Sequence, residues 1–424
     1  MSRHRDQLLT IGLTAAASAA LTIFVRNFIS GEKKIKHRIA QRYGISDPQF
    51  ERSMSQLLGP PILPGNKVTP LYNGVEIFPA MLAAIASAER SICFETFVYW
   101  SGRVADIFAD ALAKKAREGV RVNVLLDGVG CNCVNGDAIR RMVDAGVELE
   151  VFHLGNFART NERTHRKLLI IDGHLGFTGG VGIADEWEGD ARNENEFRDT
   201  QYRVEGPVVA QMQAAFLDNW MRTRAEVLHG EAYFPQLREA GELHCQMFKS
   251  SPMEGSESAR LMYLLSIAAA EKNIRVGNAY FLPDDLTTQT LLEAVERGVS
   301  VEILVPGEWN DSKTVRLAGR QRIGQLLEGG VRVYEYEPTM YHCKNMMIDG
   351  LWTSVGSANF DNRSFRINAE ANLNVINRDF TATAVQVFRQ DLQRAREFTL
   401  QDWHDRSPAE KIAGSAATLL RSQL

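Results

Sequence analysis

Two segments of the chain carry a histidine, a lysine and an aspartate at the same spacing, His-x-Lys-x4-Asp. Their members are His165, Lys167 and Asp172 in THRKLLIIDG, and His342, Lys344 and Asp349 in YHCKNMMIDG. Each residue of the second segment follows its counterpart by 177 positions. In a chain of 424 residues with nine histidines, about 0.02 such motifs are expected by chance. Two copies therefore indicate a repeated segment that does chemistry.

Each segment has the pattern of a β-strand, so the histidine and the lysine project from the same face. Two such faces that meet form a cationic pocket suited to a phosphate oxyanion. Asp172 and Asp349 lie five residues beyond the lysines, an odd step that places them on the other face. We therefore expect these two aspartates to hold a turn or a buried cation. A single histidine of this kind would be read as a satisfied core residue, but two at equivalent positions favour chemistry.

The two histidines are the groups expected to do the covalent and proton-transfer work. One imidazole attacks phosphorus and forms a phosphohistidine, and the other protonates the leaving alkoxide and later activates the acceptor. The lysines stabilise the negative charge. The sequence has no cluster with the spacing of a metal site, so we expect neither a metal nor another cofactor.

Further polar residues follow each segment. A histidine in this role needs a carboxylate to fix its tautomer, and Asp199 and Glu370 stand at matching places in two similar strands. The alternative for these acids is a surface ion pair at a strand edge. Gly180 and Ser357, each after a glycine, allow the backbone to approach and donate to phosphate, and Asn359 adds a neutral donor.

The elements around these segments also occur twice. Helical patterns alternate with buried strands such as VRVNVLLDG and VSVEILVPG, which predicts an α/β fold. We expect two tandem α-β-α lobes, residues 70–228 and 240–405, related by a pseudo-twofold axis and sharing one composite active site. A polar stretch around residues 226–245 joins them.

The ends of the chain are expected to lie outside these lobes. Residues 8–25 carry no charge and approach the length of a membrane span, so residues 1–30 are predicted to be a membrane anchor. The alternatives are a cleaved signal peptide and a peripheral or buried helix. The basic residues that follow place the lobes in the cytoplasm, at the inner membrane. Residues 31–69 are predicted to be a basic juxtamembrane linker. Residues 406–424 are predicted to be a helical tail, either amphipathic on the protein surface or lying on a membrane.

Composition narrows the classes of function. A 45% hydrophobic content and a net charge of −4 are typical of a globular protein and argue against nucleic acid as the main partner. The five cysteines show no disulfide or zinc spacing, which suits a reducing compartment.

With these motifs, the chain resembles the phospholipase D superfamily, and more narrowly the bacterial cardiolipin synthases. The narrower likeness rests on NAYFLPD, GVSVEILVPG, EYEPTMYHCKNMMIDG, VGSANFDNRSFRINAEANL, THRKLLIIDG and DTQYRVEGPVV. It covers roughly residues 70–405. The resemblance implies phosphatidyl transfer without a metal, and it groups Asp172 and Asp349 with the catalytic histidines and lysines. It also makes His165 the nucleophile and His342 the acid and base, a choice that the repeat alone leaves open.

The function expected from the resemblance is transfer of a phosphatidyl group from phosphatidylglycerol, or phosphatidylethanolamine, to phosphatidylglycerol. The expected partners are anionic membrane phospholipids and no nucleic acid, and the oligomeric state stays open. The alternatives are a phospholipase D-type hydrolase, a phosphodiesterase acting on nucleic acid, and a lipid-binding scaffold. One departure from the family pattern is Gly182, which stands where the second half has Asn359, so the site is not fully symmetric.

Overall fold

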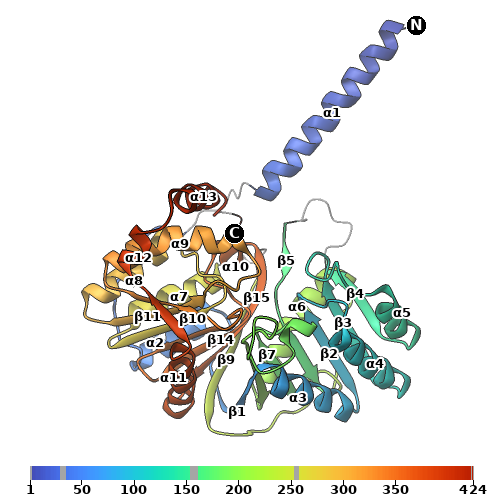
Figure 1. Cartoon of the computed structure of the whole chain (residues 1–424). Helices are drawn as coiled ribbons and strands as arrows, with labels where there is room; N and C mark the ends of the chain where they lie inside the picture. The colour runs from blue at the N-terminus through green and yellow to red at the C-terminus, as the bar shows by residue number, and fades with distance from the viewer. Residues whose placement is uncertain (1, 29–34, 153–160, 253–256, 422, 424) are drawn as a thin grey trace.

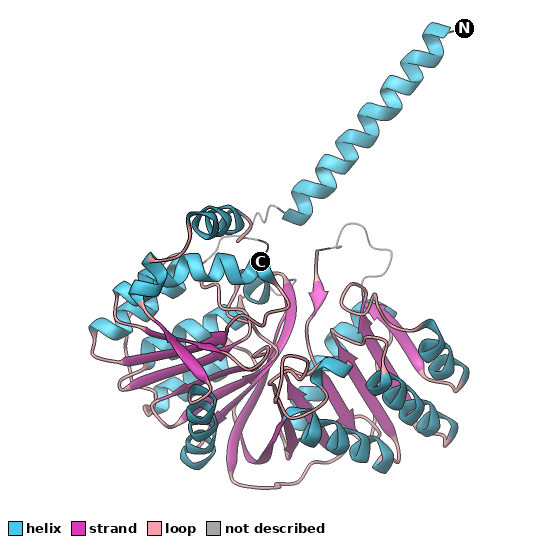
Figure 2. Cartoon of the chain, viewed as in Figure 1, coloured by secondary structure: helices cyan, strands magenta, loops and turns pink. Residues whose placement is uncertain are grey.

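The computed structural model describes the chain except for residues 1, 29–34, 153–160, 253–256, 422 and 424. Two similar lobes lie side by side, with helices covering both faces of a central sheet (Figures 1 and 2). Sixteen strands belong to this sheet, in the order β16-β12-β11-β10-β13-β14-β15-β9-β1-β8-β7-β6-β2-β3-β4, with β5 paired to β15. Read outward from the β9-β1 pair, the two halves have the same order of seven strands, and the second half adds β16 at its edge. The sheet therefore has the predicted pseudo-twofold symmetry.

The first lobe contains the first eight strands and four of the helices. They are β1 (Leu63–Tyr72), α3 (Asn73–Ser87), β2 (Ser91–Thr96), α4 (Arg103–Arg117), β3 (Arg121–Asp127), α5 (Gly136–Asp144), β4 (Glu148–Phe152), β5 (Arg163–Thr164), β6 (Leu168–Ile171), β7 (Leu175–Gly179), β8 (Thr200–Glu205) and α6 (Val209–Arg224), with a short 3-10 turn at Asp185–Trp187. β2, β3 and β4 are parallel, whereas β6, β7 and β8 are antiparallel.

The second lobe repeats this plan and adds elements at its end. It comprises β9 (Leu243–Ser250), α7 (Ser258–Ala269), β10 (Asn273–Asn278), α8 (Asp285–Glu296), β11 (Ser300–Pro306), α9 (Lys313–Glu328), β12 (Arg332–Tyr336), β13 (Lys344–Ile348), β14 (Trp352–Gly356), α10 (Asn362–Arg366), β15 (Asn368–Ile376), α11 (Arg378–Leu392), β16 (Ala395–Phe398), α12 (Leu400–His404) and α13 (Pro408–Leu419). The apolar stretches 124–126 of β3 and 303–305 of β11 are buried, as expected of parallel strands that helices cover on both faces.

One hydrophobic cluster joins the two lobes into a single body. It packs Val68, Phe216 and Trp220 of the first lobe against Met247 and Leu373 of the second, all nearly or fully buried. The β1–β9 pairing runs antiparallel across the same boundary. Because the lobes share both a sheet and a core, residues from each are held in a fixed relation at the interface.

The predicted basic linker at residues 31–69 is corrected by the structure. Helix α2 (Pro48–Leu57) packs into the core of the second lobe, where Phe50 and Met54 are 1% and 0% exposed. Strand β1 begins at Leu63, so the first lobe starts before residue 70. The end of the predicted linker is therefore part of strand β1, which has an irregularity at Gly65, where φ is +83°.

Helix α1 (Ser2–Phe28) projects away from both lobes (Figure 1). Its described apolar side chains include Leu9, Ile11 and Leu13, which are 57%, 66% and 71% exposed. Among the described residues, no helix combines the length and the apolarity that crossing a membrane requires. Part of the predicted anchor and of the basic linker, residues 1 and 29–34, lies outside the described residues.

Candidate active site

Each histidine segment lies against the main chain of the opposite lobe. Strand β5, which leads into His165, pairs in parallel with β15, and the His165 amide donates to the Ala369 carbonyl at 2.9 Å. The second segment is held in the same way, because the His342 amide donates to the carbonyl of Arg198 at 2.8 Å. These main-chain contacts cross between the lobes and bring both segments to the interface.

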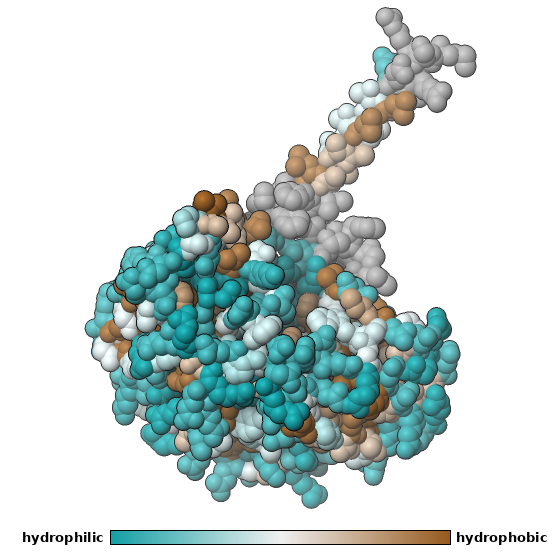
Figure 3. Space-filling model, in the orientation of Figure 1, coloured by the Kyte–Doolittle hydropathy of each residue, from teal (hydrophilic) through white to brown (hydrophobic). Residues whose placement is uncertain are grey.

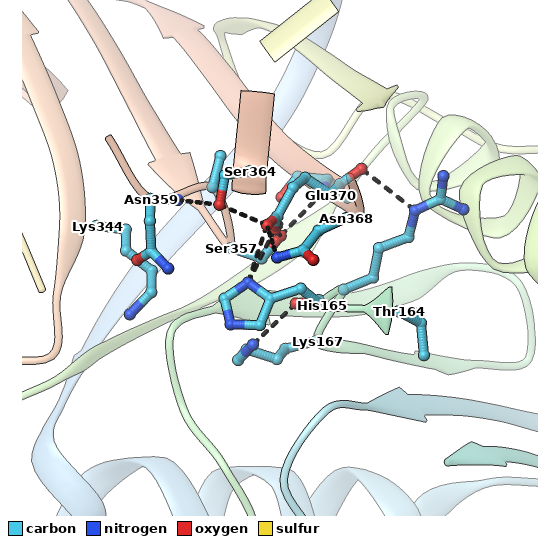
Figure 4. A network of polar contacts seen from close by, with 12 residues as sticks. Thr164, His165, Lys167, Lys344, Ser357, Asn359, Ser364, Asn368 and Glu370 are labelled. Atoms are coloured by element: carbon cyan, nitrogen blue, oxygen red, sulfur yellow. Dashed lines mark hydrogen bonds and ion pairs between the residues drawn. The ribbon is translucent and has the colours of Figure 1, made fainter. Parts of the chain in front are cut away.

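His165 is fixed by Glu370 of the other lobe (Figure 4). Its Nδ1 lies 3.0 Å from each carboxylate oxygen, and the two side chains are almost completely buried. Ser357 and Ser364 donate their hydroxyls to the same carboxylate at 2.5 and 2.7 Å, and Asn368 adds a longer bond. The carboxylate holds the proton on Nδ1 and leaves the Nε2 lone pair available as a nucleophile.

His342 is fixed by Asp199 of the first lobe. Its Nδ1 lies 2.7 Å from Asp199 Oδ2, and Trp187 donates its indole N–H to the same oxygen at 2.9 Å. The amide of Thr200 donates to the other oxygen at 2.8 Å. The two orienting carboxylates thus exchange partners across the interface: the acid in each lobe serves the histidine of the other.

The two lysines fold back beside their own histidines. Lys167 donates to the His165 carbonyl at 2.8 Å and lies over the Phe97 ring, and Lys344 donates to the His342 carbonyl at 2.6 Å. Lys344 Nζ also lies 3.1 Å from Nδ1 and 3.2 Å from Nε2 of His342. Figure 4 shows Lys167, Lys344 and His165 around one space.

Burial and the crowded positive charges shift the titration of the site. Burial lowers the pKa of His165 to about 4, and burial together with the facing Lys344 lowers that of Lys167 to about 7. Burial, reinforced by Lys344, also lowers the pKa of His342. Both imidazoles are therefore neutral at neutral pH before an anion enters.

The two orienting carboxylates have lowered pKa values although they are buried. Burial alone would raise the pKa of Asp199 and Glu370, but the facing histidines and their hydrogen bonds hold both values below the ordinary range. The carboxylates stay ionised beside neutral imidazoles, which is the state that fixes the tautomers.

The three residues predicted to contact phosphate have different places. Asn359 is 4% exposed, and its buried Oδ1 has no hydrogen-bond partner among the described residues. Gly180 and Ser357 instead serve the carboxylates: their amides donate to β-strand carbonyls, and Ser357 donates its hydroxyl to Glu370. A β-carbon added at Gly180 would overlap the Asp199 carboxylate. Gly180 and Ser357 are therefore corrected to supports of the orienting acids.

Asp172 and Asp349 stand apart from the histidines, at the far ends of β6 and β13. Each lies five positions beyond its lysine, a length of about 16 Å along an extended chain. The Asp172 carboxylate accepts three main-chain amides, from Glu89, Arg90 and Ser91 at 2.6–2.9 Å.

Asp349 accepts the amides of Glu271, Lys272 and Asn273, each at 2.8 Å. Both aspartates have positive φ, +50° and +52°. They begin the turns that connect β6 to β7 and β13 to β14. Their grouping with the catalytic residues is corrected to this structural role, as strand alternation had indicated.

Several residues at the site were missed from the sequence. Trp187 and Ser364 complete the two carboxylate environments, and Arg166 is fully buried between the lobes, where it donates to the Glu370 and Ser250 carbonyls and pairs with Asp218. Ser364 follows Trp187 by 177 positions, the offset of the two motifs, and each donates to the acid of its own lobe. The offset was therefore a signal in the sequence, but the two side chains differ so much in type that it was missed.

The arrangement can hold a phosphodiester between two imidazoles, with the side chains of two lysines beside it. Among the described residues, no group of three or more histidine, cysteine or acidic side chains is placed to hold a metal ion. The two-lobed fold with one shared site is the architecture that the resemblance to the phospholipase D superfamily implies.

Comparison with known proteins agrees with this class. A family profile described as "Cardiolipin synthase, PLD-like domain" matches residues 81–220 and 263–392. Cardiolipin synthase A of Pseudomonas syringae pv. syringae is 34% identical over 87% of this chain and 77% of its own length. Cardiolipin synthase 2 of Bacillus anthracis is 33% identical over 82% of this chain and 69% of its own. The chain therefore belongs to the cardiolipin synthase family with phospholipase D-like domains, and it is a phosphatidyltransferase by class.

The fold has a relative among solved structures. The crystal structure of phosphatidylserine synthase from Haemophilus influenzae Rd KW20 covers 89% of this chain and matches over its whole length, with a TM-score of 0.70 and 14% identity. That likeness concerns the fold.

Proposed function

We propose that the chain makes cardiolipin by moving a phosphatidyl group from phosphatidylglycerol, or from phosphatidylethanolamine, to a second phosphatidylglycerol. The observation that carries the proposal is the crossed arrangement of two histidine–carboxylate pairs with a lysine beside each. The kinship with cardiolipin synthases at 32–34% identity supports this substrate class.

In the first step, Nε2 of His165 attacks the phosphorus of the donor lipid. The bond from phosphorus to the headgroup oxygen breaks, and His342 gives that oxygen a proton, so glycerol or ethanolamine leaves. His342 is neutral in the empty site, but the entering phosphate is negative and raises its pKa, which supplies the proton when it is needed. Lys167, Lys344 and Asn359 stabilise the charge on the phosphoryl oxygens.

In the second step, a hydroxyl of phosphatidylglycerol replaces the histidine. His342 accepts the proton of that hydroxyl, the new oxygen attacks phosphorus, and the nitrogen–phosphorus bond breaks. Cardiolipin leaves and His165 returns to its starting state. Water in place of the alcohol would give phosphatidic acid, so the transferase requires an acceptor bound more effectively than water.

We also propose that α1 attaches the chain to the inner membrane, with the lobes in the cytoplasm. The uncharged residues 8–25 and the basic residues that follow support this assignment. A fluorescent protein fused to the C-terminus is expected to be bright in the cytoplasm. Labelling of the fused end from outside the membrane would overturn the orientation.

The activity is tested by reconstituting the full chain with phosphatidylglycerol, with and without phosphatidylethanolamine, and following the lipids by mass spectrometry. Cardiolipin with released glycerol supports the proposal, whereas phosphatidic acid without cardiolipin contradicts it. The intermediate is tested with radioactive phosphate in the donor lipid. His165→Ala is expected to abolish labelling of the protein, His342→Ala to slow the loss of label, and His174→Ala to behave as the wild type.

A further inference from the structure

The last helix, α13, presents its large apolar side chains to solvent. Gly414 and Ala417 are buried, and a β-carbon at Gly414 would lie 3.1 Å from the Leu317 carbonyl on α9. Ile412 and Leu419, in contrast, are 71% and 84% exposed. A surface helix ordinarily turns its large apolar residues toward the core, so α13 has the opposite arrangement.

The exposed residues form one continuous stripe. Ile412, Ala416, Leu419 and Leu420 follow one another at steps of four, three and one, which places them along a single face of the helix. Figure 3 shows apolar surface over α13, on the side of the molecule from which α1 projects. Exposed aliphatic clusters on otherwise polar surfaces mark contact sites.

Basic side chains accompany this stripe. Lys411 and Arg421 are exposed on α13 and just after it. Arg421 also lines a pocket of about 430 Å³ beside α8 and α10, whose charged walls are four basic and two acidic residues: Lys36, Arg260, Arg366, Arg421, Asp284 and Asp285. An apolar stripe bordered by excess positive charge is complementary to a surface that is apolar beneath and anionic on top.

The end of α13 is tied to the catalytic site. Asn362 donates to the Arg421 carbonyl at 2.9 Å, and Arg363 donates to the carbonyls of Gln423 and Asn161 at 3.0 Å. These contacts join α10 of the second lobe to the first lobe. The next residue of α10, Ser364, donates to the carboxylate that orients His165.

We propose that the outward stripe of α13 inserts into the interface of an anionic phospholipid bilayer and so holds the catalytic site next to the lipid surface. The proposal deepens the proposed function, since it rests on membrane lipids being the substrate. Ile412, Leu419 and Leu420 enter the boundary between headgroups and acyl chains, while Lys411 and Arg421 lie among the phosphates.

The position of α13 is tested with a spin label in the full chain. Cys133 is the exposed one of the described cysteines, so Cys133→Ser provides the background for Leu419→Cys and for the control Val75→Cys. Val75 is 51% exposed and belongs to α3, a helix on the side of the molecule opposite to α13 (Figure 1). With phosphatidylglycerol vesicles, the label at position 419 is expected to gain access to oxygen and to lose access to a water-soluble nickel complex, and the label at 75 to keep both.

A label at 419 that stays in water on these vesicles would overturn the proposal. So would a label that becomes immobile with rising protein concentration in the absence of lipid, because a second copy of the chain would then cover the stripe. Product analysis on the same vesicles separates the two proposals: phosphatidic acid in place of cardiolipin contradicts the proposed activity and leaves the depth of the label unaffected.

A second test uses Ile412→Ser, Leu419→Ser and Leu420→Ser together. Turnover of phosphatidylglycerol in vesicles is expected to fall at least fivefold, while turnover of monomeric dihexanoyl phosphatidylglycerol stays within about twofold, because the site itself is unchanged. Equal rates of variant and wild type on vesicles would overturn the proposal.

Discussion

Replacing Glu370 by glutamine separates the roles of the two histidines. Glutamine keeps the volume of the buried side chain but removes its charge and turns one oxygen into an N–H donor. If that N–H faces His165, the proton of the imidazole moves to Nε2 and the nucleophilic lone pair is lost. If the amide oxygen faces His165, a charge-assisted hydrogen bond at 3.0 Å becomes a neutral one.

The magnitude follows from that hydrogen bond. A bond to a charged group contributes about 1.5–3 kcal/mol, and 1.36 kcal/mol corresponds to a tenfold change in rate. Formation of the phosphohistidine is therefore expected to slow roughly 10- to 150-fold in Glu370→Gln. Asp199→Asn is the matched variant, since Asp199 accepts from His342 at 2.7 Å and is equally buried.

The assay uses two donors that differ in the leaving group. With phosphatidylglycerol, both variants are slow, because the attacking histidine and the proton donor both act in the first step. With phosphatidyl-p-nitrophenol, the leaving phenolate needs no proton, so the burst of nitrophenolate in Asp199→Asn is expected within about threefold of the wild type. The burst in Glu370→Gln stays slow.

The reverse pattern, a normal burst in Glu370→Gln and a slow one in Asp199→Asn, would exchange the roles of His165 and His342. Equal rescue of both variants would refute the division of labour itself. Circular dichroism and thermal unfolding of both variants verify that the fold survives the substitution.

Three other predictions concern the groups that support the site. Burial lowers the pKa of His165 to about 4, so between pH 7 and pH 5 the unfolded chain binds a proton at this residue and the folded chain does not. The free energy of unfolding should therefore fall by about 2 kcal/mol over this range. In urea titrations, His165→Gln should lose less stability than the wild type over the same range. Asp349→Asn should lower the free energy of unfolding by about 1.5–3 kcal/mol, measured by urea titration, and change phosphohistidine formation less than threefold. Gly180→Ala should slow transfer at least tenfold, because the added β-carbon displaces the Asp199 carboxylate from His342. The effect should be larger than that of Ser357→Ala, which removes one hydrogen bond to Glu370. An unaffected rate would contradict the role given to Gly180.

The sequence predicted the two-lobed α/β fold because the repeat preserves both the motifs and the order of strands and helices. It misjudged residues 31–69 as a linker, although α2 lies within this range and β1 begins in it and pairs with two neighbouring strands. Signals for α2 were present in the sequence: Asp47 caps the helix, Pro48 occupies its first turn, and the buried Phe50 and Met54 stand four positions apart, as on one face of a helix.

At the site, the sequence identified the residue types and could not identify the partners. Symmetry makes Asp199 and Glu370 equivalent, yet an equivalent pair can bond within lobes or across them, and the spacing along the chain is the same in both cases. The crossing follows from the pairing of β5 with β15, which joins only two residues of each strand. This pairing places His165 next to Glu370, 205 positions further along the chain. Such a short pairing leaves no pattern in the sequence.

The crossing has a consequence for how the enzyme can work. Each imidazole needs the acid of the other lobe to fix its tautomer, so neither lobe contains a complete catalytic unit. The supports differ as well: Glu370 receives two serine hydroxyls, whereas Asp199 receives an indole and lies against a glycine that leaves room for it. A duplicated unit would give two equivalent histidines, and a nucleophile and an acid require two unequal ones. The unequal supports around symmetric acids are the feature by which a symmetric fold can assign the two histidines to different steps.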